Sequence, residues 1–312
     1  MGWERRGPAG EEWNKPAMPQ QNRQKIQVSR QWLELLEELR QAPRRIMIVG
    51  PADSGKSTLA SWLGRKLAEV APTGMVDGDV GQSQIGPPAT VGWRLAGSAQ
   101  EQCYFVGDVS PASRPATALS ALLRAVGEAE AAGAAYSVID TTGYIEGDAA
   151  VALKTAKVEL LAPLEVLVIG DERPARRLLK CWQNFTPARI RRLNSADRLQ
   201  VKTVVQRRQH RQQIFAAALA DSNMRWVGLD DKAIFSSAGA RAEACSGLLL
   251  GFIDEMRRLV CLGLLESLDL RNHRLLAYSP ESAEAASGIV FGAIALNPAG
   301  EQLAQVAAGG TM

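Results

Sequence analysis

The feature that most constrains the fold is a glycine-rich segment between an apolar run at 46–49 and a helical pattern. Its letters, GPADSGKS over residues 50–57, match the whole GxxxxGK[ST] pattern. Glycines in this pattern let successive backbone N–H groups and a helix N-terminus face an anion, while the lysine reaches the β- and γ-phosphates. We expect a nucleotide phosphate site made by Gly50, Pro51, Ala52, Asp53, Ser54, Gly55, Lys56, Ser57 and Thr58.

Apolar runs and helical patterns alternate along the first half of the chain. We expect strands at 46–49, 75–76, 104–106, 136–139 and 166–169, and helices from about residue 58, at 116–132 and at 149–161. Strands alternating with helices predict an α/β fold of the P-loop NTPase type, a parallel sheet with helices on both faces. A short amphipathic helix that begins at Ser29 and stops before Pro43 should precede this sheet.

Three regions are expected along the chain. Residues 1–27 are polar and form a flexible tail, and residues 28–222 form the P-loop domain with an Arg-rich lid over 173–222. Short apolar runs at 247–253, 259–264, 274–278 and 288–296, separated by Gly, Pro and Asn, predict a small β-rich domain over 223–312.

Bulk composition excludes several classes of protein. The four cysteines form no CxxC pair, which argues against a zinc site or a disulfide framework and favours a cytoplasmic location. No apolar run approaches the roughly 20 residues that span a bilayer. The net charge of +3 is too small to indicate a nucleic-acid partner unless the cations cluster, as they do between residues 173 and 211.

Carboxylates follow two of the expected strands. Asp77 and Asp79 come after the strand at 75–76, and Asp140 ends the strand at 136–139. A kinase that acts on an alcohol needs one carboxylate to accept the hydroxyl proton and others to hold Mg²⁺ beside the P-loop hydroxyl. We therefore expect Ser57, Asp77, Asp79 and Asp140 to hold Mg²⁺, with Asp79 as the base and Asp140 as its rival.

Two further groups carry open alternatives. Tyr144 follows Asp140 in the segment DTTGY, where it either stacks on a base or sugar or is a buried core tyrosine. Arg207, Arg208 and Arg211 lie in or just before one helix. They either close over a transferring phosphoryl group or form a solvated basic face that binds nucleic-acid phosphates nonspecifically.

Four motifs together carry a family resemblance: GPADSGKST, VDGDVGQSQIGPPATVG, DTTGYIEG and the Arg-rich stretch. This combination resembles the polynucleotide 5′-hydroxyl kinases related to the pre-mRNA cleavage-factor kinase subunit and the ribosomal-RNA-processing kinase, in their compact archaeal and bacterial form. The resemblance covers roughly residues 28–300. It implies a kinase that uses ATP and Mg²⁺ to phosphorylate a 5′-OH end of RNA or DNA, with a single strand as the expected substrate.

Carried over to this chain, the resemblance gives roles to particular residues. Lys56 and Asp79 are expected to be catalytic, with Arg207 and Arg211 as lid residues. Gln82, at the Walker B element, joins Thr142, Gly143 and Tyr144 in the expected substrate site. The clasp aromatic is Tyr144 here, where eukaryotic members usually have Trp.

Two other functions compete with the polynucleotide kinase. Some members of the family bind ATP without detectable kinase activity, so an ATP-binding assembly subunit of an RNA-processing complex is the second reading. A small-molecule kinase is the third, and it would need a closed acceptor pocket rather than an open basic groove. ATP is preferred to GTP because no Asn-Lys-x-Asp base-reading motif follows the fourth strand.

Overall fold

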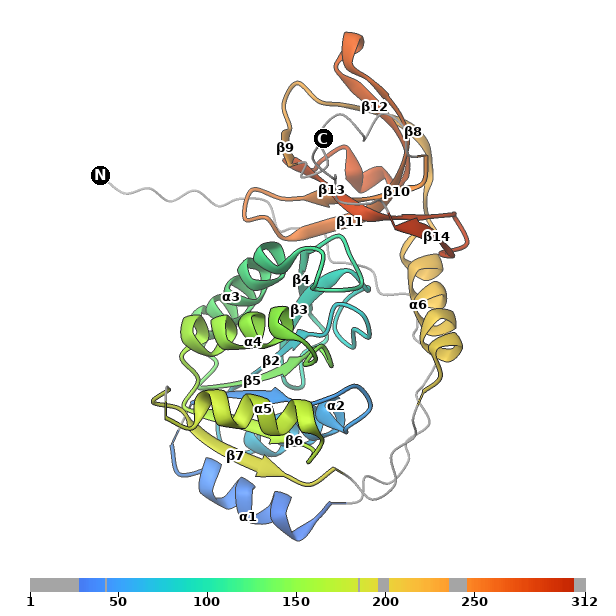
Figure 1. Ribbon diagram of the computed structural model, residues 1–312. Coiled ribbons are helices and arrows are strands. Elements are labelled where there is room, and N and C mark those ends of the chain that lie inside the picture. Colours follow the sequence, from blue (N-terminus) through green and yellow to red (C-terminus); the bar gives the residue numbers. More distant parts are fainter. Residues whose placement is uncertain (1–27, 43, 185, 196–201, 236–245, 306–312) are drawn as a thin grey trace, which may run out of the picture.

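The computed structural model describes residues 28–42, 44–184, 186–195, 202–235 and 246–305. Within these residues the chain forms two β-sheets, and helices cover both faces of the first (Figure 1). The α/β class with an additional C-terminal β-sheet is therefore confirmed. The tail expected at residues 1–27 lies outside the described residues.

In the described residues the first sheet has seven strands, in the order β4-β3-β2-β5-β1-β6-β7. Its parallel strands are β1 (Arg45–Val49), β2 (Thr73–Gly78), β5 (Tyr136–Thr141), β6 (Glu165–Ile169) and β7 (Arg189–Leu193). β3 (Thr90–Leu95) and β4 (Gln102–Phe105) add an antiparallel edge. Residues 79–89 contain no helix and are too few for a parallel crossover, so β3 returns antiparallel to β2.

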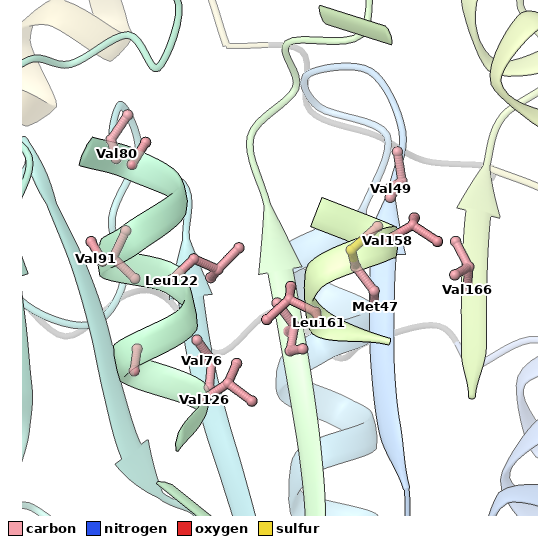
Figure 2. Packing of buried hydrophobic residues seen from close by; sticks show 14 of the residues in the cluster. Met47, Val49, Val76, Val80, Val91, Leu122, Val126, Val158, Leu161 and Val166 are labelled. Carbon is pink, nitrogen blue, oxygen red and sulfur yellow. The ribbon is translucent and has the colours of Figure 1, made fainter. Parts of the chain in front are cut away.

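The two faces of the sheet bury alternate residues of each strand. Ile46 and Ile48 of β1 pack against α1 (Arg30–Leu39) and α2 (Lys56–Leu67). Met47 and Val49 pack with residues of α3 (Pro115–Ala131), α4 (Asp148–Leu161) and α5 (Arg173–Trp182) on the other face, as Figure 2 shows for part of this cluster. Helices on both faces are confirmed.

The expected N-terminal helix is confirmed as α1. The Ser29 side chain accepts a hydrogen bond from the backbone N–H of Trp32 at 3.3 Å, which caps the first turn. Trp32 lies against Trp62 of α2 with ring centroids 5.5 Å apart. α1 therefore packs on the first sheet beside α2 and does not form a separate unit.

The second sheet follows the helix α6 (Val204–Ala218) and is antiparallel along its main path, in the order β14-β13-β10-β11-β12-β8. β9 pairs in parallel with β13. The strands are β8 (Asn223–Gly228), β9 (Ala233–Phe235), β10 (Leu248–Ile253), β11 (Leu259–Asp269), β12 (Arg274–Ser279), β13 (Gly288–Leu296) and β14 (Gln302–Gln305), with single 3-10 turns at Leu270–Asn272 and Glu281–Ala283.

The two sheets are joined by a shared apolar contact. Phe105 at the end of β4 packs with residues of β10, β11 and β13, and with Phe215 of α6. A Cβ atom on Gly251 would lie 2.4 Å from the Phe105 ring, so glycine is needed for this approach. The backbone N–H of Ala293 donates to the Gly107 carbonyl at 2.7 Å, which fixes the contact.

The basic stretch from residue 173 divides between the two parts of the fold, although the sequence analysis treats 173–222 as one lid. α5 and β7 belong to the first sheet and its covering layer. Many of their arginines have acidic partners: Arg176 pairs with Asp171 at 3.0 Å, and Arg191 pairs with Glu165 at 3.0 Å. We therefore restrict the expected lid to α6, because ion pairs and the first sheet hold α5 and β7 in place.

Candidate active site

The P-loop connects β1 to α2 at the carboxyl end of the parallel strands. A Cβ on Gly50 would lie 2.7 Å from the Ile169 carbonyl oxygen, and Gly55 has a φ of 93°, so both turns require glycine. The helix begins at Lys56, two residues earlier than expected. Its first-turn N–H groups therefore face the loop, which is the arrangement that binds phosphate.

The P-loop side chains are packed inward. Lys56 is buried, and its Nζ donates to the Pro51 carbonyl of the same loop at 2.6 Å. Ser54 Oγ is buried and, among the described residues, has no hydrogen-bond partner. Both groups are thus at hand for a phosphate anion, which would satisfy them together.

Asp140 ends β5 beside the P-loop and hydrogen-bonds the Ser57 side chain. Its Oδ1 also accepts from the Thr141 N–H at 2.8 Å. Burial raises the pKa of Asp140 to about 6, with Asp79 adding to the rise and with Lys56 and Ser57 opposing it. A carboxylate joined to the P-loop hydroxyl is the oxygen pair that Mg²⁺ takes in such enzymes.

Asp77 holds a loop rather than facing an open site. Its two carboxylate oxygens accept backbone N–H groups from Asp79 at 2.9 Å, Gln84 at 2.5 Å and Ile85 at 3.1 Å. Burial raises the pKa of Asp77 to about 8, and the charges of Asp140 and Asp79 add to the rise. Asp77 and Asp79 therefore have different surroundings in the structure, although their spacing in the sequence suggests that they act together.

Asp79 is only partly buried and lies where β2 ends. Its Oδ1 accepts the N–H groups of Gly81 and Gln82, both at 3.1 Å. Gln82 donates through Nε2 to the Gly81 carbonyl at 2.7 Å, and its Oε1 is buried without a partner among the described residues. These contacts fix the Asp79 carboxylate against its own turn.

The turn after β5 touches the P-loop directly. A Cβ on Gly143 would lie 2.5 Å from the backbone nitrogen of Ala52, so only glycine fits between the two loops. Tyr144 next to it is half-buried, and Ile145 is the residue that enters the core cluster. Tyr144 is therefore not a fully buried core residue, and its stacking role stays a prediction.

Helix α6 brings arginines to the same edge. Arg207 forms an ion pair with Asp53 of the P-loop. Partial burial and the charges of Arg208 and Arg207 lower the pKa of Arg211, while Asp79 favours its charged form. Arg208 points elsewhere, donating to the Gln302 carbonyl at 2.9 Å. Of the three arginines named from sequence, Arg207 thus contacts the P-loop, and Arg211 lies near enough to Asp79 for its charge to act.

Two buried lysines of α4 escaped the sequence analysis. Lys154 and Lys157 are 0% and 1% exposed, and the charges of Asp79 and Asp140 act on both. Burial lowers the pKa of Lys157 to about 8 and that of Lys154 well below its usual range. The signal was available, because the spacing 154, 157 and 161 places both lysines on the face of Leu161 that packs inward.

The described residues hold no group of three or more His, Cys, Asp or Glu side chains placed to bind a metal. Mg²⁺ in phosphoryl-transfer sites is held by one or two carboxylates and by the substrate phosphates. The Ser57–Asp140 pair fits that need, whereas Asp77 is occupied by backbone donors.

Cysteines and membrane spans can be checked in the same residues. Among the described residues, Cys103, Cys181 and Cys261 form no disulfide. In the part of the chain that the structure describes, none of the helices has the length and apolar character needed to cross a membrane.

Comparisons with known proteins follow the same motifs. Residues 50–217, more than half of the chain, match the family model "mRNA cleavage and polyadenylation factor CLP1 P-loop". A polyribonucleotide 5′-hydroxyl-kinase of Methanocaldococcus jannaschii is 31% identical over 153 residues, 46% of this chain and 42% of that protein. One from Pyrococcus abyssi is 27% identical over 208 residues, 64% of this chain and 57% of that protein. The chain thus spans about half the length of the curated relatives it matches.

Solved structures show the same fold. A wild-type Clp1p–Pcf11p complex superposes with a TM-score of 0.64 at 12% identity, covering 84% of this chain and 77% of that one. A second Clp1p structure with Pcf11p gives a TM-score of 0.66 at 12% identity, with 84% and 78% covered. The resemblance inferred from the motifs is confirmed: the chain belongs to the CLP1 P-loop family.

Proposed function

We propose that this protein is an ATP-dependent polynucleotide 5′-hydroxyl kinase. The observation that carries the proposal is the convergence of three parts on one sheet edge. The P-loop supplies a phosphate cradle, the Asp79 turn supplies a partly exposed carboxylate, and the Gly143 turn contacts Ala52 of the cradle. Similarity to archaeal polyribonucleotide 5′-hydroxyl-kinases supports RNA as the acceptor.

Nucleotide binding is assigned to the P-loop. The N–H groups from Gly50 to Thr58 and the Lys56 ammonium hold the ATP phosphates. Ser57 and Asp140 would hold Mg²⁺, which supplies charge neutralisation of the phosphates. For this, Lys56 exchanges its bond to the Pro51 carbonyl for a phosphate oxygen.

Transfer is assigned to Asp79. Its carboxylate takes the proton of the 5′-OH, the 5′-oxygen forms a bond to the γ-phosphorus, and the bond from that phosphorus to the β-phosphate oxygen breaks, leaving ADP. Asp140 is the weaker candidate for the base because it is buried and bonded to Ser57, whereas Asp79 is partly exposed. Arg207 and Arg211 stabilise the charge that develops on the transferred group.

The acceptor strand is assigned to the open edge beside Tyr144. Tyr144 is half-buried and offers an aromatic ring for stacking of the terminal nucleotide, and Gln82, Thr142 and Gly143 are assigned to the same acceptor site. A single strand fits this role because its end base is free to stack. DNA with a 5′-OH end offers the same reacting group, so both nucleic acids are proposed substrates.

The experiment is transfer of labelled γ-phosphate from ATP with Mg²⁺ to short RNA and DNA strands that carry either a 5′-OH or a 5′-phosphate. We expect label only on the 5′-OH strands, and none with Lys56→Ala. Lys66→Ala is the matched control, because Lys66 lies on the same helix and pairs with Glu69 at 2.6 Å. ATP binding without labelled product would instead indicate an ATP-binding assembly subunit.

Competition by excess nucleoside and by unlabelled long strands distinguishes a polynucleotide kinase from a small-molecule kinase. A polynucleotide kinase is inhibited by the long strand and loses acceptor binding as salt rises, because phosphate contacts release counterions. A small-molecule kinase would label the nucleoside and ignore the strand.

A further inference from the structure

Lys154 is a fully buried lysine that has no part in the proposed mechanism. It lies on the inward face of α4, and its Nζ contacts the end of β5 and the turn that follows. The distances are 2.8 Å to Thr141 Oγ1, 2.7 Å to the Thr142 carbonyl oxygen and 3.4 Å to Thr142 Oγ1. One side chain thus holds the turn at two successive residues.

The direction of these hydrogen bonds follows from the acceptors. Thr141 Oγ1 donates its only proton to the Ile48 carbonyl of β1 at 2.7 Å. Lys154 must therefore donate to Thr141 Oγ1, and it also donates to the Thr142 carbonyl, which only accepts. Two N–H groups are enough, so the network persists whether Lys154 carries two or three protons.

This network ends on the strand that leads into the P-loop. Ile48 lies two residues before Gly50. Gly143, in the same turn, lies against Ala52 with no room for a Cβ atom. Two contacts thus hold the turn that carries Tyr144: the hydrogen bonds from Lys154 and the P-loop residue Ala52.

Lys157 offers an internal comparison. It is one helical turn further along α4, it is equally buried, and the same two carboxylates act on it. Among the described residues, the side-chain hydrogen bonds from α4 to Thr141 and Thr142 nevertheless all come from Lys154. Burying a lysine costs free energy because its charged group loses hydration. If Lys154 served only for packing, an apolar side chain of similar volume would do so without that cost.

We propose that Lys154 is a positioning residue that sets the spacing between the acceptor turn at 142–144 and the phosphate cradle at 50–57. This inference rests on the proposed function, since it assigns the turn to the polynucleotide. Lys154 touches neither substrate. It acts through Thr141 and Thr142, so its loss should disturb the acceptor strand more than the nucleotide.

The experiment compares Lys154→Met with Lys157→Met and with Lys180→Met, which replaces an exposed lysine of α5. Oligonucleotide binding is measured by fluorescence anisotropy, transfer kinetics are measured with each substrate varied separately, and unfolding is followed in urea. A displaced acceptor costs up to about 100-fold in rate. For Lys154→Met we therefore expect an oligonucleotide kcat/KM about 10- to 100-fold lower, weaker oligonucleotide binding and a nearly unchanged KM for ATP.

Lys157→Met should keep the oligonucleotide Kd of the wild type, and Lys180→Met should keep both binding and turnover. If Lys154→Met fails to fold, Gly143→Ala tests the same turn from its other side, because its methyl would press on Ala52. Oligonucleotide binding should again be weaker in this variant. Because Ala52 belongs to the phosphate site, ATP binding should weaken as well, so the comparison of ATP with oligonucleotide binding is made only on the lysine variants.

Two results would overturn the proposal. One is wild-type oligonucleotide binding and kinetics in Lys154→Met or in a folded Gly143→Ala. The other is an equal loss of ATP and oligonucleotide binding together with a lower unfolding midpoint, which marks a general packing role. A wild-type protein that transfers no phosphate contradicts the kinase assignment but leaves the anisotropy comparison intact, so the two failures are distinguishable.

Discussion

Arg207 of α6 forms an ion pair with Asp53 of the P-loop, so a carboxylate of the cradle meets the helix that carries the proposed lid. Asp53 has a φ of 57°, and its side chain is turned out of the loop toward α6. Both partners are mostly buried, with 27% and 17% of their side chains exposed. The lid helix is therefore tied to the phosphate site by a charge pair that an incoming anion would contest.

Asp53→Asn should tighten ATP binding. The change removes a negative charge from the edge of the cradle and frees Arg207 for phosphate, an effect of about 1 kcal/mol or roughly fivefold in Kd. The measurement is ATP binding by titration calorimetry. Asp171→Asn serves as the control, since Asp171 also pairs with arginines, Arg176 and Arg192, but not with the lid helix. Weaker ATP binding in Asp53→Asn would show that Asp53 supports the cradle instead.

Asp140→Asn should flatten the pH dependence of stability in the absence of nucleotide and Mg²⁺. Burial raises the pKa of Asp140 from its ordinary 3.8 to about 6, so the folded state holds this proton where the unfolded state has lost it. Its contribution to the free energy of unfolding is complete below pH 3.8 and is lost as pH rises through about 6.

Urea unfolding of both proteins across this window tests the sign. The wild-type free energy of unfolding should fall relative to the variant as pH rises from about 4 to about 6, by at most ~1.4 kcal/mol per pH unit. Comparing the two proteins cancels shared effects, such as that of Glu38, whose pKa Arg191 lowers to about 2. A wild-type advantage that grows with pH would mean that Asp140 is stabilised as a carboxylate.

Tyr144→Ala should weaken oligonucleotide binding by about 1–3 kcal/mol, the range for a base stacked on an aromatic ring. ATP binding should not change, because the cradle contacts Gly143 rather than the Tyr144 ring. Tyr144→Phe is the matched control and should bind like the wild type, since stacking needs only the ring. Fluorescence anisotropy with a labelled 5′-OH strand measures both. Equal loss in Tyr144→Phe would assign the contact to the hydroxyl.

Phe105→Ala should destabilise the two sheets together. Phe105 is 5% exposed and lies against Gly251, in the cluster that also contains Phe215. Removing a buried phenylalanine costs about 3–5 kcal/mol. Urea unfolding should show one transition at a lower midpoint for Phe105→Ala, with little change for Phe235→Ala, whose ring is 37% exposed. Loss of only the second sheet's signal would show that the sheets unfold independently.

Much of the fold could be predicted because its signals are local. Alternating apolar strands and helices, the Ser29 cap and the P-loop each act over a few residues, and all were placed near their observed bounds. The antiparallel edge of β3 and β4 was not predicted, because only residues 104–106 show a clear apolar strand pattern and the alternation of strands with helices indicates a parallel sheet. β7 was not predicted because three of its five residues, RIRRL, are arginines. Their acidic partners Glu38, Glu165 and Asp171 lie outside this strand.

The candidate site residues could be named from the sequence, but the contacts that distinguish one from another could not. Asp77 and Asp79 look equivalent at a spacing of two, yet one is enclosed by three backbone donors and the other stays partly exposed. The spacing of Lys154 and Leu161 could predict that Lys154 is buried, but its partners are a hydroxyl and a carbonyl outside α4. Such contacts depend on tertiary structure, which the spacing does not encode.

Asp79→Asn, assayed beside the wild type for transfer of labelled γ-phosphate to a 5′-OH RNA strand, tests the central claim most directly. The account predicts that the wild type labels the strand, and that the variant binds ATP and RNA but loses turnover by about 100-fold or more, since general-base catalysis contributes that much. Full turnover in Asp79→Asn would move the base to Asp140. A wild type that binds ATP and RNA yet labels nothing would contradict the kinase itself.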